Sequence, residues 1–257
     1  MSQNVTLNQY SKYFLFSIIY SFSPAKLDEI ISNICSPYRS KALKNQKIPI
    51  YYGIPSDNLE SFYMIDVWFD SEYEYIGGMA GLPRPDGLPK RDLLFDINID
   101  DGKPLSLEFR NSANPKTKGF FTLLLLGGVN HLPLSRVLNS FANAPYGASL
   151  GKVPTIVRTG ELISGMGRID IPSYIPDKGE TAPGHDWYAE ISESGEFTAL
   201  MRCNISGTVP IPHCRLHEKF MYFEGELSSF RRDQLDKLHL IRHHAKNFTT
   251  CLTWSGK

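Results

Sequence analysis

The chain has 257 residues, which is enough for one large domain or two small ones. Hydrophobic side chains make up 42% of it, as in ordinary globular proteins, and 27 basic side chains balance 27 acidic ones. Because it contains no strong basic cluster and no apolar run of about 18 residues, the composition predicts no nucleic-acid partner and no membrane partner.

The N-terminal segment predicts a strand followed by a helix. Residues 12–22 are rich in aromatic and β-branched side chains, which favour a strand. Ser23 suits the N-cap of the next helix and Pro24 its first position. The helix should end near Cys35, because Pro37 follows. Its buried stripe is predicted from four apolar residues at helical spacing: Leu27, Ile30, Ile31 and Ile34.

The apolar run Phe14–Phe22 does not predict a secretory signal. A neutral segment with the single Lys12 precedes it, and no convincing small-residue cleavage site follows. We therefore expect a cytoplasmic protein, or a periplasmic one if a leader peptide has been removed.

An acidic and aromatic segment provides the candidate protein interface. Residues 61–69 alternate between apolar and polar side chains, which predicts a half-buried strand. No Lys or Arg lies between Lys47 and Arg84. Aromatic anchors surrounded by charge are typical of protein interfaces, although a sheet with one solvated face is the alternative interpretation. The residues assigned to the interface are Asp57, Glu60, Asp66, Trp68, Asp70, Glu72, Tyr73 and Glu74.

The middle of the chain predicts a hairpin, a central strand and a short helix. Residues 93–100 alternate in hydrophobicity, an Asp-Gly pair at 101–102 supplies a turn, and residues 105–109 alternate on the return. The run 119–129 is almost wholly apolar, which predicts a strand covered on both faces. Residues 133–144 predict a short helix.

The C-terminal part predicts more strands and a final helix. Residues 152–200 have the pattern of short strands and loops, and 196–206 and 215–230 are each predicted to form one strand. Residues 231–252 predict an amphipathic helix, whose buried stripe comprises Leu235, Leu238, Ile241, Ala245 and Phe248.

These elements together predict an α+β fold, mainly antiparallel sheet with a few packed helices. The chain is expected to form two lobes, residues 1–146 and 147–257, or a single domain. The sequence leaves the oligomeric state open.

The four cysteines fall into two pairs with different predictions. Cys203 and Cys214 lie at the ends of neighbouring predicted strands, where a disulfide can form in an oxidising compartment, whereas in the cytoplasm both should stay thiols. Cys35 and Cys251 lie on helices at the two ends of the chain and are predicted to be small buried apolar side chains.

Histidines near the second cysteine raise the possibility of a zinc site. His213, Cys214 and His217 could supply three ligands. If residues 215–230 form a strand, however, His213 and His217 lie too far apart to share an ion. His239 and His243 lie one helical turn apart but lack the Glu of the H-E-x-x-H motif. We therefore predict no metal and no cofactor.

Candidate catalytic motifs depart from their patterns. The segment 147–155 has three residues instead of four between its glycines, and Val153 stands where a phosphate-binding loop needs Ser or Thr. Residues 164–167 lack the first glycine of a nucleophile elbow. The sequence thus predicts no catalytic residue.

Residues 166–252 resemble the C-terminal part of immunity proteins encoded beside bacterial toxins, such as those of type VI secretion systems. The resemblance is carried by YIPDKG (174–179), by the two cysteines with their proline-containing spacer, and by the basic helix after SSF (228–230). It implies a protein-binding role without catalysis, with a cognate toxin or effector as the partner, and it assigns no site residues. The alternatives are an enzyme with a His and carboxylate site, and a structural component of a phage or secretion assembly.

Overall fold

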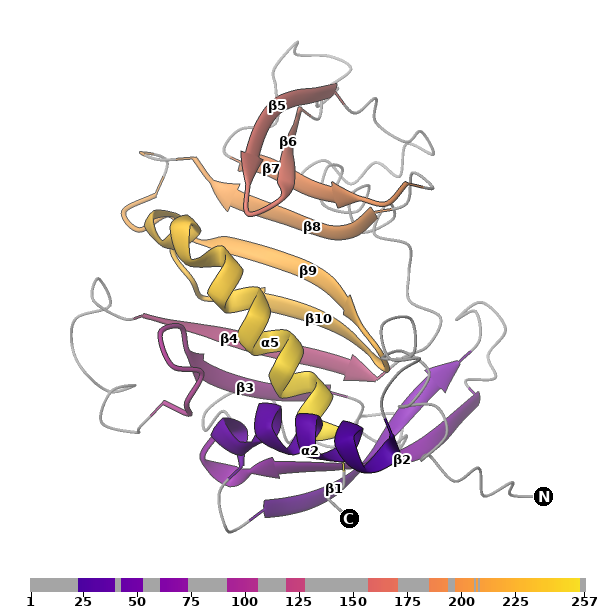
Figure 1. The fold of residues 1–257 in the computed structure, drawn as a ribbon. Helices are drawn as coiled ribbons and strands as arrows, with labels where there is room; N and C mark the ends of the chain where they lie inside the picture. Colours follow the sequence, from indigo (N-terminus) through magenta and orange to yellow (C-terminus); the bar gives the residue numbers. More distant parts are fainter. Residues whose placement is uncertain are drawn as a thin grey trace.

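The computed structural model describes residues 23–39, 43–52, 61–73, 92–105, 119–127, 157–170, 185–193, 197–205, 207 and 209–254. In these residues two α-helices pack on antiparallel β-structure, so the predicted α+β class is confirmed. Figure 1 shows the main sheet with the C-terminal helix laid across it, and a two-stranded ribbon beyond one end of the sheet.

An eight-stranded antiparallel sheet forms the main layer, in the order β3-β4-β10-β9-β8-β7-β6-β5. Six consecutive strands make a meander, and β4 and β3 then join beside its last strand. The strands are β3 (Asp92–Asn98), β4 (Phe120–Gly127), β5 (Val157–Ile163), β6 (Met166–Asp170), β7 (His185–Ile191), β8 (Phe197–Asn204), β9 (Cys214–Phe220) and β10 (Phe223–Ser228).

The second piece of β-structure is an antiparallel ribbon of β1 (Leu43–Tyr52) and β2 (Ser61–Asp70). Its register places Ile48 opposite Ile65, and both side chains are fully buried. The ribbon approaches the end of β4 so closely that a Cβ atom on Gly127 would collide with the carbonyl oxygen of Pro49. Glycine at position 127 therefore allows the ribbon to dock on the sheet.

Helix α2 (Pro24–Cys35) begins and ends where the sequence predicts. The Ser23 side chain accepts a hydrogen bond from the backbone N–H of Lys26, so it acts as the N-cap, and Pro24 occupies the first turn. A short 3-10 helix, η1 (Ser36–Tyr38), follows directly.

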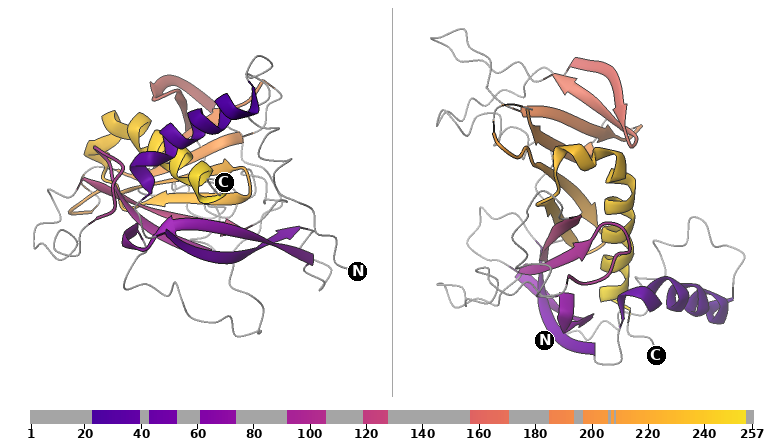
Figure 2. Two further views of the ribbon diagram at one scale, coloured as in Figure 1. Left: turned by 60° about the horizontal axis from the view of Figure 1, so that its bottom comes forward. Right: turned by 90° about the vertical axis from the view of Figure 1, so that its left-hand side faces the viewer.

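The C-terminal α-helix begins about two turns later than the sequence predicts. A 3-10 helix, η6 (Arg232–Lys237), leads into α5 (Leu238–Leu252). The predicted stripe is confirmed, because its α-helical members Leu238, Ile241, Ala245 and Phe248 are buried and Leu235 packs against the core. In the right-hand view of Figure 2, α5 runs along one face of the sheet, which we call the helix face.

Aromatic rings join the three parts of the fold. The ring centroid of Phe248 in α5 lies 4.8 Å from that of Phe95 in β3 and 4.8 Å from that of Tyr73. Tyr73 is the last residue of the 3-10 helix η3 (Ser71–Tyr73), which follows the ribbon. Phe95 in turn lies 5.2 Å from Phe69 of β2. Each of these rings is at most 1% exposed, and burying one stabilises the fold by about 1.5–3 kcal/mol.

An ion-pair cluster fixes α5 to strands β7 and β9 of the sheet. The guanidinium of Arg242 donates to both oxygens of Glu218 on β9, at 3.0 and 2.7 Å, and to Glu190 on β7 at 2.5 Å. Burial works to lower the pKa of Arg242, but its hydrogen bonds to the two carboxylates and their negative charges outweigh burial and raise the pKa above the ordinary value. The arginine is therefore charged and held on the sheet.

One detail of the predicted strands is wrong. Residues 215–230 form two strands, β9 and β10, because the chain reverses at a turn over Met221 and Tyr222. The predicted hairpin turns as expected after β3, where Gly102 has a φ of +70° and Ile97 forms a bridge with Pro104, and residues 106–109 of its return lie outside the described residues. The full-length partner of β3 is β4.

The central position of β4, between β3 and β10, is as predicted, but its two faces differ. Phe121, Leu123 and Leu125 are fully buried, whereas Leu124 and Leu126 are only partly covered. The strand predicted at 12–22, the helix predicted at 133–144 and the lobe boundary at 146–147 lie outside the described residues. Strands from both sides of that boundary share the eight-stranded sheet, and the division into lobes stays a prediction.

Candidate binding site

The structure places the residues of the predicted interface in three kinds of environment. Asp66 and Trp68 are half-buried on β2, and Glu72 is exposed just after it. Asp57, Glu60 and Glu74 lie outside the described residues.

Asp70 and Tyr73 are buried, so they are not part of the predicted surface. Asp70 is 6% exposed, and one of its carboxylate oxygens accepts the backbone N–H of Glu72. Tyr73 is 1% exposed and donates its hydroxyl hydrogen bond to the carbonyl oxygen of Gly102 at 3.1 Å. Both side chains therefore hold the end of the ribbon in place.

The ribbon presents apolar side chains that the prediction did not include. Phe62, Tyr63 and Met64 at the start of β2 are 36%, 38% and 40% exposed. The register puts Phe62 and Met64 on the same outer face as Asp66 and Trp68. Lys47 lies opposite Asp66 across the ribbon, so the acidic stretch has a basic neighbour in space that it lacks in sequence.

A polar cleft lies on the sheet face turned away from α5, which we call the far face. Alternation and register put two neighbouring rows of side chains there, His185, Asn204 and His213 in one and Arg202, Arg215 and Ser228 in the other. These six residues line a cleft of about 570 Å³, together with Phe120, Cys214, Ser229 and Arg231.

The charge of this cleft is concentrated on arginine. Arg202 and Arg215 are direct cross-strand partners, so their two side chains are neighbours on the far face. Burial lowers the pKa of Arg202, and the charge of Arg215 lowers it further, while Glu226 opposes both effects. Arg215 lies 3.5 Å from Glu226, and Arg231 pairs with Asp233. Neither of these two carboxylates is among the described residues that line the cleft.

One wall of the cleft contains a backbone conformation that is rare outside glycine. Ser229, directly after β10, has a φ of +66°, which costs on the order of 1 kcal/mol for a residue with a Cβ atom. Its Oγ lies 3.0 Å from Oγ1 of Thr122, and Thr122 donates to the buried carboxylate of Asp96 at 2.8 Å. This chain of polar groups holds Ser229 in its strained position.

The histidines considered for zinc are distributed over several sites. His217 lies 3.7 Å from Glu226 on the far face, His243 contacts the Asn247 amide at 3.0 Å, and His239 lies 3.1 Å from the carbonyl oxygen of Asp236. Among the described residues, no group of three or more His, Cys, Asp or Glu side chains could hold a metal ion. No helix in the described part of the chain is long and apolar enough to cross a membrane.

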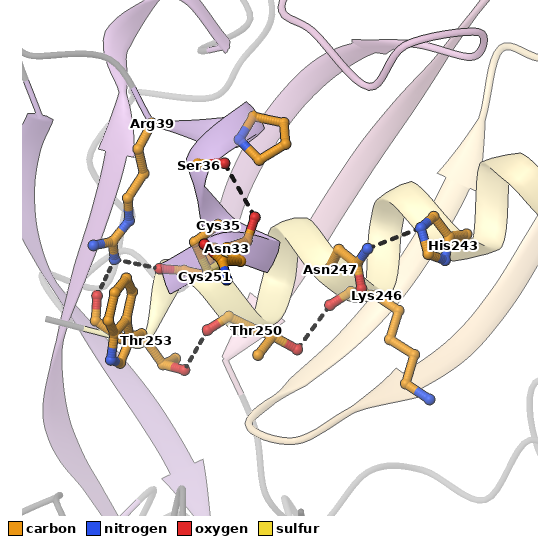
Figure 3. The surroundings of a disulfide bond; sticks show 12 residues. Asn33, Cys35, Ser36, Arg39, His243, Lys246, Asn247, Thr250, Cys251 and Thr253 are labelled. Carbon is orange, nitrogen blue, oxygen red and sulfur yellow. Dashed lines mark hydrogen bonds between the residues drawn. A yellow bond between two sulfur atoms is a disulfide. The ribbon is translucent and has the colours of Figure 1, made fainter. Parts of the chain in front are cut away.

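All four cysteines form disulfides. Cys203 and Cys214, the pair expected to bond in an oxidising compartment, are joined across β8 and β9. Cys35 and Cys251 are buried as predicted, but they are not separate thiols, because a disulfide joins them over a sequence separation of 216 residues. Figure 3 shows this second bond between α2 and α5, next to Arg39, whose guanidinium donates to the carbonyl oxygen of Cys251 at 2.7 Å.

The sequence contains a signal for the arginine pair that our prediction missed. Arg202 precedes Cys203, and Arg215 follows Cys214. In an antiparallel pair, residues that flank a cross-strand disulfide in this way must also face each other. The proposed disulfide therefore already implied a cross-strand pair of arginines.

Comparison with known proteins gives two distant structural similarities. No protein-family model and no curated protein sequence matches the chain. Smlt3025, an immunity protein of the Stenotrophomonas maltophilia type IV secretion system, is 12% identical, with a TM-score of 0.49 over 81% of this chain and 97% of that one. The Neisseria meningitidis iron-regulated outer membrane lipoprotein FrpD is 9% identical, with a TM-score of 0.41 over 80% and 92%. The secretion system named for the first protein is type IV, not the expected type VI.

Proposed function

We propose that the chain is an immunity-type binding protein that neutralises a cognate toxin or effector by covering a basic surface of it with the β1–β2 ribbon. The observation that carries the proposal is the outer face of β2, where the exposed Phe62 and Met64 lie in line with Asp66 and Trp68. The resemblance of residues 166–252 to immunity proteins gives the class of partner.

The ribbon has the composition of an interface centre with a charged rim. Apolar side chains that lose their contact with water supply most of the binding energy in protein complexes, and surrounding charges guide the encounter. Phe62 and Met64 would supply the apolar contact, and Asp66 and Glu72 the negative charge. Because Tyr73 and Asp70 are buried, they support this surface from below without contacting the partner.

Co-expression with the product of a toxin-like reading frame directly upstream tests the proposal. The native chain should co-purify with that product. The double variant Phe62→Ala/Met64→Ala should bind it at least about tenfold more weakly in calorimetry, since hot-spot side chains contribute about 2 kcal/mol or more each. Raising the salt concentration should slow association, because steering by exposed charges is screened.

Leu162 on β5 offers a matched control. It is 70% exposed and belongs to the opposite edge of the eight-stranded sheet, so Leu162→Ala removes an exposed apolar side chain without touching the ribbon. Its affinity should stay within about twofold of the native value. Equal affinities of the native chain and the ribbon variant would contradict the proposed surface, and symmetric oligomers that bind no such product would favour a structural role.

We also propose that the protein works in an oxidising compartment, in place of the cytoplasm expected from the N-terminal sequence. Two disulfides support this, since such bonds persist in secreted and periplasmic proteins and are rare in the cytoplasm. Alkylation of the native protein without reduction, followed by mass spectrometry, should label none of the four cysteines. Labelling of all four in protein taken from its native host would contradict this.

A further inference from the structure

We propose that the far-face cleft is a binding site for a small molecule that carries a diphosphate or an equivalent pair of anionic groups. The cleft brings Arg202 and Arg215 side by side and surrounds them with side chains that can donate hydrogen bonds. This site is distinct from the ribbon, and it does not depend on the proposed toxin partner.

The first argument is the chemistry of the lining. Its charged and polar side chains are three arginines, two histidines, two serines and one asparagine, with no carboxylate among the described residues. Guanidinium groups bind phosphate oxygens through two parallel hydrogen bonds, and such bonds to a charged partner are about twice as strong as neutral ones. The lining therefore matches an anion and disfavours a cation.

The second argument is the unfavourable arrangement of the two central arginines. Like charges directly opposite each other on neighbouring strands destabilise a sheet. Here Arg202 faces Arg215, and the pKa of Arg202 is lowered by burial and by Arg215. Glu226 lies 3.5 Å from Arg215 and offsets part of the repulsion. A bound anion would relieve the repulsion that remains.

The third argument is the strained serine at the cleft wall. A positive φ at a non-glycine residue is kept only where surrounding contacts enforce it, and such residues are concentrated at functional sites. Ser229 is enforced by the hydrogen-bonded chain through Thr122 to Asp96. The strain places two consecutive serines, Ser228 and Ser229, in the lining of the cleft.

The size of the cleft limits the ligand to a small molecule. Its volume of about 570 Å³ lies within the range of about 300–1,000 Å³ that is typical of small-molecule pockets. A single phosphate would leave most of it empty, whereas a diphosphate attached to an organic group would reach both the arginine pair and Phe120.

Pyrophosphate is the probe for the anionic part, because it carries the diphosphate group alone. Calorimetric titration of the full-length protein at low salt should show saturable binding of one pyrophosphate. Arg202→Gln should weaken this binding by about tenfold or more, because it removes a charge-assisted pair of hydrogen bonds. Arg215→Gln, on the exposed side of the pair, should also weaken it.

Lys219→Gln is the matched control. Lys219 is exposed on the same strand and the same face as Arg215 but does not line the cleft, so the variant removes one positive charge from β9 and leaves the cleft intact. Its affinity should stay within about twofold of the native value. Circular dichroism verifies that each variant is folded. The saturable binding of one pyrophosphate is measured on the native protein and needs no variant. Absence of saturable binding to the native protein, or equal weakening by Lys219→Gln and the two arginine variants, would overturn the proposal.

Discussion

Histidines on the far face and on α5 make the stability of the protein sensitive to acid. Burial lowers the pKa of His217, and Arg202 and Arg215 lower it further against the opposing charge of Glu226. Burial also lowers the pKa values of His185 and His244. In the unfolded chain these histidines bind protons near pH 6.5, whereas in the folded chain they bind them only at lower pH. Protonation therefore favours unfolding, and stability is lost as the pH falls through about 6.5.

We expect the free energy of unfolding, measured in urea, to be lower at pH 5.5 than at pH 7.5. In the variant His217→Gln this loss should be smaller, because the variant has no proton to gain at position 217. His239→Gln, which changes an exposed histidine on α5, should lose as much as the native protein. If all three proteins lose the same amount, His217 does not contribute to the acid sensitivity.

At the residue scale, the sequence predicts features that depend on neighbouring residues, such as helix capping, and it misses contacts between segments that are far apart in the sequence. Ser23 and Pro24 determine the start of α2 through their own backbone preferences, and the structure confirms this. Tyr73, by contrast, follows the strand that contains Asp66 and Asp70, which the sequence predicts at a surface, but its ring packs against Phe248 of α5. Nothing within a few residues of Tyr73 indicates that the C-terminal helix covers it.

At the scale of elements, the contact between the ribbon and the sheet depends on one glycine. We expect Gly127→Ala to destabilise the protein by about 1–3 kcal/mol in urea unfolding, because the added Cβ forces Pro49 and β1 away from β4. Gly167→Ala on β6 is the control, since its Cβ would meet no atom closer than 3.9 Å, and its effect should stay within about 0.5 kcal/mol. Equal unfolding midpoints for the two variants would show that the ribbon adapts without cost.

Strands and helices could be predicted where the sequence marks their ends. The helix at Pro24–Cys35 lies between a capping serine and a proline, and the strand at Ser61–Asp70 alternates regularly. The error over 215–230 has a physical cause, because the turn at Met221 and Tyr222 contains neither glycine nor proline. Near this turn, glycine at position 225 in β10 leaves room for the ring of Phe220, with which a Cβ would collide.

At the scale of the whole molecule, sheet order and long-range covalent links escape sequence patterns. Local alternation predicts a hairpin after β3, but it does not predict that β3 pairs along its length with β4, or that β4 pairs with β10 from the C-terminal part of the sequence. The same holds for Cys35 and Cys251, because no spacing rule relates residues so far apart. Their bond follows only from the packing of α2 beside α5 (Figure 3).

The two disulfides should differ in how much they stabilise the fold. A cross-link restricts the unfolded chain more when it closes a longer loop, and the bond between Cys35 and Cys251 spans 216 residues, compared with 11 for Cys203 and Cys214. We expect the double variant Cys35→Ser/Cys251→Ser to lose about 2–5 kcal/mol of unfolding free energy, and Cys203→Ser/Cys214→Ser to lose less. Urea unfolding of both variants without reductant measures the difference. The native protein with reductant should lose at least as much as the first variant. A larger loss from Cys203→Ser/Cys214→Ser would mean that this cross-strand bond acts mainly by stabilising the folded sheet beside the arginine pair. It would also mean that the bond between Cys35 and Cys251 adds little to the packing that Phe248 and Tyr38 already provide between these segments.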